Sequence, residues 1–416
     1  MGNRRLLFTL LLSSLLLIGC GQEPTAESLM PVENLSCSGQ YIKEKYLVKF
    51  RSGEIRSYYF TNREQFKSQI VEPNLSLIEY IEYDQRFEFS PRENGVFSGS
   101  MIDNYGLVRI NAAAAWQKGV RGQGVTVAVV DSGVDISHPQ LSQQIAYNQG
   151  EMGLDSKGLN KSLNGVDDDG NGYVDDYAGY DFIENSGQMV DTVSHGTHVA
   201  GIIAAQHNLD FVSNSQVQGL APQAKILPVR FLGNGGGTLE GALNSLDYAR
   251  KRGVQIINAS WGGSGCSQAL QDKVREITSA GIIFVAAAGN SGASLDQFPE
   301  FPAAFRFPLQ ITVGSSGTRD GMSSFSNYSR ALVDLFAPGF NIFSTLPQNR
   351  VGAQSGTSMA APYVAAAAAL LYSANPNAAP ENVVNALLNS VDVNVEFLNR
   401  SQGRLNVARA LEIMAQ

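Results

Sequence analysis

The pattern of apolar and polar positions divides the chain into two parts. In the first part, residues 46–50 alternate as a strand does, residues 62–70 have helical spacing, and residues 75–83 again favour a strand. This α+β unit is so small that it would be only marginally stable by itself. We therefore expect it to accompany a larger domain.

From Asn104 onward, short and nearly continuous apolar runs alternate with helical stretches. The runs are residues 125–130, 225–229, 254–260, 281–289 and 309–315. Strands that are apolar on both faces and alternate with helices predict an α/β fold with a mainly parallel central sheet covered on both sides. The last residues, 403–416, predict a terminal helix.

The first twenty residues have the pattern of an export signal. Arg4 and Arg5 precede an apolar run over residues 6–18, which is shorter than the roughly 20 residues of a membrane-spanning helix. The run ends at Cys20 in a sequence that resembles the bacterial lipobox, whose cysteine is lipidated after cleavage. The alternative is a plain secretory signal that contains a cysteine. Gly21, rather than Asp, follows; by resemblance to Gram-negative lipoproteins, this permits sorting to the outer membrane.

Charge and cysteine content narrow the possible functions. A formal net charge of −8 gives no basic stripe for phosphates, so nucleic acid is not an expected partner. Apart from Cys20, only Cys37 and Cys266 remain, and they are far apart in sequence. The sequence therefore argues against a disulfide framework and predicts that Cys266 is a small packed thiol.

Three stretches carry candidate chemistry. Asp131 directly follows an apolar strand, and ligands in open α/β sheets meet the carboxyl ends of strands. His195 and His198 lie at the expected start of a helix, where they are either a pair of metal ligands or a catalytic base and a packing residue. Ser358 precedes a helix that is apolar nearly all round, and the N–H groups at such a helix start suit a developing oxyanion.

Together these stretches resemble a known family. The segments "VAVVDSGVD", "SHGTHVAG" and "SGTSMAAP" are similar to the three motif blocks of the subtilisin-like serine proteases, or subtilases. The resemblance covers about residues 104–416, and it implies a three-layer subtilisin-like fold and the hydrolysis of peptide bonds. It implies that His195 is the base, Ser358 the nucleophile and Asp131 the residue that orients the base. His198 then becomes a packing residue, since the stretch lacks the H-E-x-x-H spacing of a zinc protease.

The resemblance also implies an oxyanion hole and a binding cleft. Asn290 and the backbone N–H of Ser358 would bind the oxyanion. Residues 232–238 would form one strand-like edge for an extended peptide. Further expected cleft residues are Ser260, Trp261 and Gly262 on the other edge, and Ala287, Ala288 and Gly289 in the wall of the first pocket.

An acidic loop predicts a structural calcium site. Asp167, Asp169 and Asn171 occupy positions 1, 3 and 5 of an EF-hand-like loop, and the Tyr173 carbonyl is at position 7. Ala178 replaces the usual glutamate at position 12, so that Asp175 or Asp176 would supply the late carboxylate. No cofactor is expected for catalysis.

These patterns predict a signal peptide over residues 1–19, a lipidated tether over 20–40, an inhibitory propeptide over 41–100 and a catalytic domain over 101–416. The predicted protein is an exported, lipid-anchored precursor of an endopeptidase that acts on polypeptides. Self-cleavage near residues 90–106 would detach the protease from Cys20 and release it.

Two other hypotheses for the function fit the sequence less well. An α/β-hydrolase esterase needs a G-x-S-x-G elbow and the order Ser, Asp, His, whereas this chain has G-T-S-M-A and the order Asp, His, Ser. The second hypothesis is an inactive, calcium-binding surface protein with a subtilase fold. The only sequence feature against it is that all of the expected site residues are present.

Overall fold

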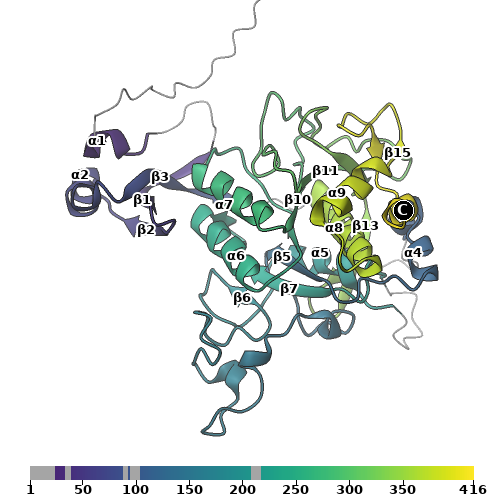
Figure 1. Cartoon of the computed structure of the whole chain (residues 1–416), viewed down its shortest axis with the longest axis horizontal. Coiled ribbons are helices and arrows are strands. Elements are labelled where there is room, and N and C mark those ends of the chain that lie inside the picture. The colour runs from purple at the N-terminus through teal and green to yellow at the C-terminus, as the bar shows by residue number, and fades with distance from the viewer. Residues whose placement is uncertain (1–23, 33–38, 88–91, 94–103, 208–216) are drawn as a thin grey trace, which may run out of the picture. The chain divides into compact units, whose positions relative to one another are not determined.

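The computed structural model describes residues 24–32, 39–87, 92–93, 104–207 and 217–416 (Figure 1). The chain forms two compact units. The smaller contains residues 44–83 together with the stretch up to Val32, and the larger contains residues 33–43 and 84–416. The predicted signal peptide and Cys20 lie outside the described residues.

The smaller unit has the α+β character that the sequence predicts. Strand β1 (Gln40–Phe50) pairs antiparallel with β2 (Ile55–Tyr59), and β3 (Ile78–Phe87) follows a helical stretch. That stretch contains α2 (Arg63–Phe66), a π-helical turn (Lys67–Val71) and a 3₁₀ turn (Glu72–Asn74). The rings of Tyr46 and Phe66 stack with centroids 3.9 Å apart in its apolar core, near the short helix α1 (Ala26–Leu29).

A nine-stranded sheet forms the centre of the larger unit, with the order β15-β16-β12-β11-β10-β9-β5-β7-β6. The pairings from β16 through β12, β11, β10, β9, β5 and β7 to β6 are parallel, and only the edge strand β15 is antiparallel. The strands are β5 (Thr126–Asp131), β6 (Tyr180–Asp181), β7 (Lys225–Arg230), β9 (Ile256–Ala259), β10 (Ile283–Ala287), β11 (Gln310–Ser316), β12 (Leu335–Pro338), β15 (Asp392–Val393) and β16 (Gly403–Arg404). The predicted mainly parallel sheet is confirmed.

Helices cover both faces of this sheet and make the three expected layers. Helices α6 (Leu239–Lys251) and α7 (Gln268–Ser279) pack on one face, against β5, β7 and β10. Helices α5 (His195–Ala204) and α8 (Thr357–Ala374) pack on the other (Figure 1). The remaining helices of this unit are α3 (Tyr105–Arg109), α4 (Ala113–Gln117), α9 (Pro380–Asn389) and the C-terminal α10 (Val407–Met414).

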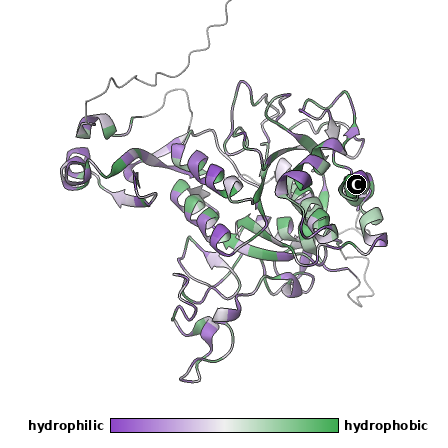
Figure 2. Ribbon diagram, in the orientation of Figure 1, coloured by the Kyte–Doolittle hydropathy of each residue, from purple (hydrophilic) through white to green (hydrophobic). Residues whose placement is uncertain are grey.

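Helix α8 is the centre of the core. It is long and apolar enough to cross a membrane by length and composition, but 83 % of it is buried inside the domain. Its alanine-rich surface lets it approach β9, β10, β11 and β12 closely, and α5, α9 and α10 surround it. Figure 2 shows the same distribution, with hydrophobic residues concentrated on the inner strands and helices.

A hairpin fastens α5 to the rest of the domain. Strands β13 (Ile342–Leu346) and β14 (Arg350–Ser355) pair antiparallel, and β14 runs directly into α8. The Ser344 hydroxyl donates to the carbonyl of His198 at 2.7 Å, and the Thr345 hydroxyl donates to the carbonyl of Thr197 at 2.8 Å. The hairpin thus holds the helix that begins with His195.

Candidate active site

Asp131 and His195 form a buried pair at the carboxyl end of β5. The Asp131 Oδ1 atom lies 2.7 Å from His195 Nδ1, and the two residues are 0 % and 2 % exposed. Because an ionised carboxylate only accepts hydrogen bonds, Nδ1 carries the proton in the neutral ring and the lone pair is on Nε2. The geometry therefore prepares His195 to accept a proton.

Asp191 was not among the predicted site residues, and it bonds to the segments that carry Asp131 and His195. Its Oδ1 accepts from the Ser132 hydroxyl at 2.9 Å, and its Oδ2 accepts from the backbone N–H and the hydroxyl of Thr197 at 2.9 and 2.6 Å. The Ser132 hydroxyl in turn accepts from Gly196 N at 2.9 Å. Asp191 therefore joins the loop after Asp131 to the first turn of α5. No spacing rule for such a carboxylate is visible in the sequence.

Ser358 lies in the first turn of α8 and is held by Ser260, the residue that directly follows β9. Its hydroxyl donates to the Ser260 carbonyl at 3.0 Å, and the Ser260 hydroxyl donates to the Ser358 carbonyl at 2.8 Å. Asn258 donates to the same Ser260 hydroxyl at 2.8 Å. Helices α5 and α8 are in contact, so that His195 and Ser358 begin two adjacent helices.

The Asn290 amide is oriented by the residue next to Ser358. Its Oδ1 accepts from the backbone N–H of Thr357 at 2.8 Å and from the Thr357 hydroxyl at 3.0 Å. Two donors identify this atom as the oxygen, so Nδ2 is the opposite end of the amide. A Cβ atom on Gly356 would lie 3.4 Å from Nδ2, which places this donor beside the turn that leads to Ser358.

The chain's own residues 84–87 occupy the expected cleft in the larger unit. Arg86 and Phe87 pair antiparallel with Thr238 and Gly237, which form β8 (Gly237–Thr238). Phe87 is buried, with its ring 6.2 Å from Phe231 and 5.2 Å from Trp261 between centroids. An extended segment thus adds a strand to one predicted edge and fills an aromatic pocket beside the other.

The remaining expected cleft residues lie around the same site. Ala287 and Ala288, at the end of β10, are buried, and Gly289 has a φ of 101°, where a Cβ would collide with Asn327 and Glu300. Gly262 faces the backbone of Phe301. Farther along the chain, Arg92 pairs with Ser355, three residues before the nucleophile, through β4 (Arg92–Glu93) and β14.

His198 faces away from the site and into the hairpin. It is fully buried, and its Nε2 lies 2.9 Å from the Ile342 carbonyl and 3.2 Å from the Gly352 carbonyl. Since carbonyl oxygens only accept, Nε2 carries the hydrogen. Burial, with a smaller effect of His195, lowers the pKa of His198 to about 3. These contacts give His198 a packing role.

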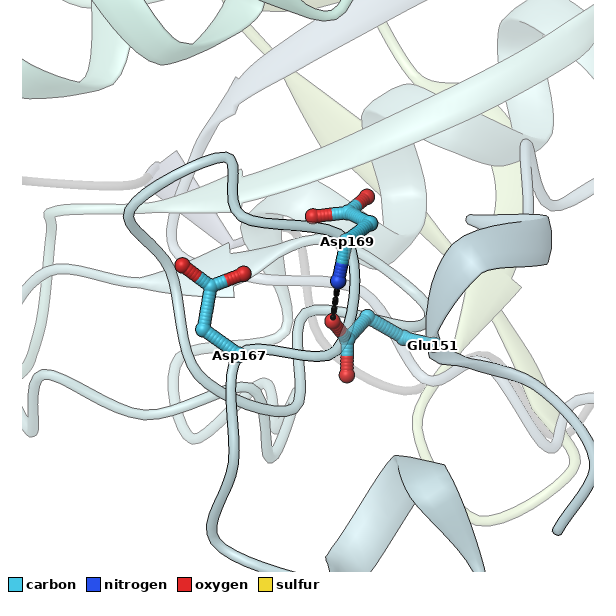
Figure 3. Close-up of side chains that lie close together, drawn as sticks. All are labelled: Glu151, Asp167 and Asp169. Atoms are coloured by element: carbon cyan, nitrogen blue, oxygen red, sulfur yellow. Dashed lines mark hydrogen bonds between the residues drawn. The ribbon is translucent and has the colours of Figure 1, made fainter. Parts of the chain in front are cut away.

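Two of the predicted calcium ligands lie close together, and a third carboxylate that was not predicted joins them. Carboxylate oxygens of Glu151, Asp167 and Asp169 lie within 4.8 Å of one another. Figure 3 shows the three side chains around a common space, with Asp169 N donating to Glu151. Glu151 is fully buried, and its Oε2 has no hydrogen-bond partner among the described residues. Burial raises the pKa of this carboxyl group.

The other predicted loop ligands have different surroundings. The Asp176 carboxylate is not in this group, because Tyr248 donates to it at 2.7 Å and Arg252 at 3.1 Å. Asn171 lies between the two arrangements, since its amide donates to both Asp169 and Asp176 at 3.2 Å. Its Oδ1 accepts from Tyr173 N at 2.8 Å. Glu151 could not be recognised from the sequence, since it precedes the loop at no characteristic spacing.

The prediction for Cys266 is wrong. Cys266 is disulfide-bonded and is not a packed thiol. The two other cysteines of the chain, Cys20 and Cys37, are outside the described residues. The prediction failed because it weighed separation in sequence, whereas the fold brings a segment near Cys37 to Cys266: Gly39 lies against Gly265.

A serine at the start of a buried helix, which contacts the helix begun by a carboxylate-oriented imidazole, is the arrangement expected of a serine hydrolase. Comparison with known proteins narrows this class. The family model for subtilases matches residues 122–404, and the chain therefore belongs to the subtilase family. It is a serine endopeptidase.

Relatives in this family extend over most of the chain. It is 39 % identical over 274 residues to the major intracellular serine protease of Bacillus subtilis, covering 64 % of this chain and 74 % of that protein. It is 33 % identical over 310 residues to thermitase of Thermoactinomyces vulgaris, covering 74 % and 95 %. It is 29 % identical over 381 residues to the alkaline protease of Shouchella clausii, covering 86 % and 88 %.

Proposed function

We propose that this subtilase is an exported endopeptidase that cuts polypeptides with Asp131, His195 and Ser358 and is made as a self-processed precursor. The observation that carries the assignment of the triad is the buried 2.7 Å contact between Asp131 and His195. This contact keeps the proton on Nδ1, so that Nε2 of the neutral ring can act as a general base. Ser358 lies on the adjacent helix α8.

The catalytic steps follow from these positions. The Ser358 hydroxyl rotates from the Ser260 carbonyl toward His195, gives its proton to Nε2 and attacks the scissile carbonyl carbon. The resulting oxyanion accepts from Asn290 Nδ2 and Ser358 N, which lie 3.4 and 3.6 Å from the position of a Cβ on Gly356. The imidazolium, stabilised by Asp131, then protonates the leaving amine. Water repeats the sequence on the acyl-enzyme and restores Ser358.

Self-processing is supported by the segment that occupies the cleft. Phe87 lies in the aromatic pocket and Arg92 pairs beside β14, so the described residues on both sides of 88–91 flank the nucleophile. We therefore infer that the processed bond lies between residues 87 and 92, a span that overlaps only the early end of the range of 90–106 expected from the sequence. Until it is cut, residues 84–87 exclude substrate from the same edge.

The location of the precursor rests on the sequence of its N-terminal segment. The apolar run over residues 6–18 and the lipobox-like end at Cys20 support export and lipid anchoring in a bacterial envelope. The mass of the N-terminal peptide from a membrane fraction would test this, because a diacylated Cys20 differs from a free N-terminus.

The chemistry of the Glu151 group fits a calcium ion. Hard cations take carboxylate and carbonyl oxygens, and an unpaired buried carboxylate oxygen is costly without a cation. Glu151, Asp167 and Asp169 would hold the ion, and it would join the 3₁₀ turn at Glu151 to the loop over residues 166–176. Its role would be structural, and no catalytic step uses it.

A comparison of wild type with Ser358→Ala tests the catalytic assignment. We expect wild type to be cut between residues 87 and 92 and to hydrolyse an unstructured protein, whereas Ser358→Ala stays full length and inactive. If wild type also stays uncut and hydrolyses nothing in the presence of calcium, the inactive surface protein replaces this proposal. If Ser358→Ala is cut like wild type, processing needs another protease.

A further inference from the structure

The disulfide at Cys266 lies where the segment before β1 meets the catalytic domain. Within the larger unit, a Cβ on Gly39 would lie 2.5 Å from Gly265 Cα, so the two backbones are in direct contact. Gly265 immediately precedes Cys266. Both positions require glycine because of this close approach.

A buried glutamine holds the same junction. Gln85 Nε2 donates to the Cys266 carbonyl at 2.7 Å, and its Oε1 lies 3.1 Å from the Cβ position of Gly39. Gln85 is itself buried. Residues 39, 85 and 265–266 therefore meet at one point, on the chain segments just before β1 and at the end of β3.

The contact between Gly39 and Gly265 indicates which cysteine is the disulfide partner of Cys266. Cys37 is two residues before Gly39, a span of at most about 7 Å, and disulfide-linked Cα atoms are about 4.4–6.8 Å apart. Cys20 is the only other cysteine in the sequence. If it carries a thioether-linked lipid, as proposed above, its sulfur is not available.

We propose that Cys37 and Cys266 form a disulfide that keeps the pro-segment attached to the protease after self-processing, so that release requires reduction as well as cleavage. The inference rests on the proposed self-processing. The order along the chain is Cys20, Cys37, the processed bond, Cys266. Cutting between residues 87 and 92 leaves the lipid anchor and the protease in two peptides joined by this one bond. It replaces the expectation that cleavage alone frees the enzyme.

The Cys37–Cys266 disulfide would also prolong the inhibition of the protease by its pro-segment. A tethered segment has an effective concentration of about 1 mM in favourable geometry, far above the nanomolar concentrations of a diluted enzyme. Residues 84–87 would therefore return to the cleft repeatedly while the disulfide is intact. Reduction by a dithiol transfers two electrons and two protons, gives free thiols on Cys37 and Cys266, and oxidises the dithiol to its disulfide. Cys266 is only partly buried, so a reductant can reach it.

Full-length wild type, Cys37→Ser and Cys37→Ser/Cys266→Ser, each expressed with its signal, test the link. We expect processed wild type to stay in the membrane fraction and to run as one species without reductant. Dithiothreitol should separate it into two peptides, release the catalytic peptide and raise the activity of the diluted enzyme about tenfold or more. Both variants should separate without reductant, and dithiothreitol should not change their activity. Cys37→Ser leaves the catalytic domain unaltered, so it controls for misfolding of the double variant.

A second experiment tests the disulfide independently of self-processing. Ser358→Ala with a recognition site for an added protease between residues 94 and 103 is cut on demand, and the digest is mapped by mass spectrometry without reduction. A Cys37–Cys266 peptide supports the link even if wild type never processes itself. A Cys20–Cys266 peptide, a free Cys266 thiol, or peptides that separate without reductant would overturn it.

Discussion

The hydroxyl of Ser132 donates to Asp191 and accepts from Gly196, so a single carboxylate connects the segment after the orienting aspartate to the helix of the base. Asp191 does not touch the site of reaction. It sets the relative position of Asp131 and His195, and it is therefore a positioning residue whose effect should appear in turnover rather than in substrate binding.

We expect Asp191→Asn to lower kcat by about 10–100-fold with little change in KM. The asparagine amide keeps one acceptor oxygen, but its NH2 group cannot accept from the donors of Thr197 or Ser132. The connection between the segments that carry Asp131 and His195 is therefore weaker. Steady-state kinetics on a peptide substrate measure this. Asp272→Asn, on the surface of α7, is the control and should change kcat less than twofold. Equal kcat in Asp191→Asn and wild type would contradict the positioning role.

Asn290 should act only on the transition state. Loss of the oxyanion-hole asparagine in subtilisin, a member of this family, lowers kcat by about 10²–10³, and we adopt that known magnitude for Asn290→Ala. Thr357→Val keeps the backbone donor to Asn290 but removes the hydroxyl that holds the same oxygen, so we expect a smaller loss of kcat. A KM effect without a kcat effect would show that Asn290 binds substrate instead.

The neutral form of His198 should make stability depend on pH. Its pKa in the folded protein is about 3, below the ordinary value of 6.5, so the unfolded chain binds more protons between these values. Its contribution is fully present above about pH 6.5 and is lost as the pH falls toward 3, by up to about 1.4 kcal/mol per pH unit.

Chemical unfolding of Ser358→Ala at pH 4.5 to 7 measures this dependence, because the background prevents autolysis. His198→Gln keeps a donor for the Ile342 and Gly352 carbonyls but does not titrate. The difference in unfolding free energy between the two proteins should therefore shrink as the pH falls. A difference that is constant over this range would mean that His198 is already charged or does not differ in pKa from the unfolded state.

Removal of calcium should destabilise the precursor through Glu151. With Ser358→Ala as background, we expect a chelator to lower Tm, and calcium at a hundred times its Kd to add about 2.7 kcal/mol to the free energy of unfolding. Glu151→Gln keeps the size of the side chain but removes the charge, and it should abolish most of this calcium-dependent shift. Asp155→Asn, in the same insertion but outside the group, should retain it. A full calcium shift in Glu151→Gln would exclude this site.

The sequence predicted elements with a strong local pattern and missed contacts that exist only in three dimensions. The alternation of apolar runs and helical stretches was sufficient for the parallel sheet, because each strand is buried on both faces. The segments around Asp131, His195 and Ser358 carry enough identity to indicate the family. Asp191, Glu151 and the disulfide of Cys266 have no such signal, since each depends on a contact that only the folded chain makes and that no characteristic spacing marks.

The hairpin that fastens α5 has a consequence for how the protein tolerates change. The base begins α5, the nucleophile follows directly from β14, and the hairpin β13–β14 is bonded to α5 through Ser344, Thr345 and the ring of His198. The distance between base and nucleophile is therefore set inside the core, without help from surface loops. A change in the length of an exposed segment such as the acidic loop over residues 166–176 should therefore leave the spacing of base and nucleophile intact.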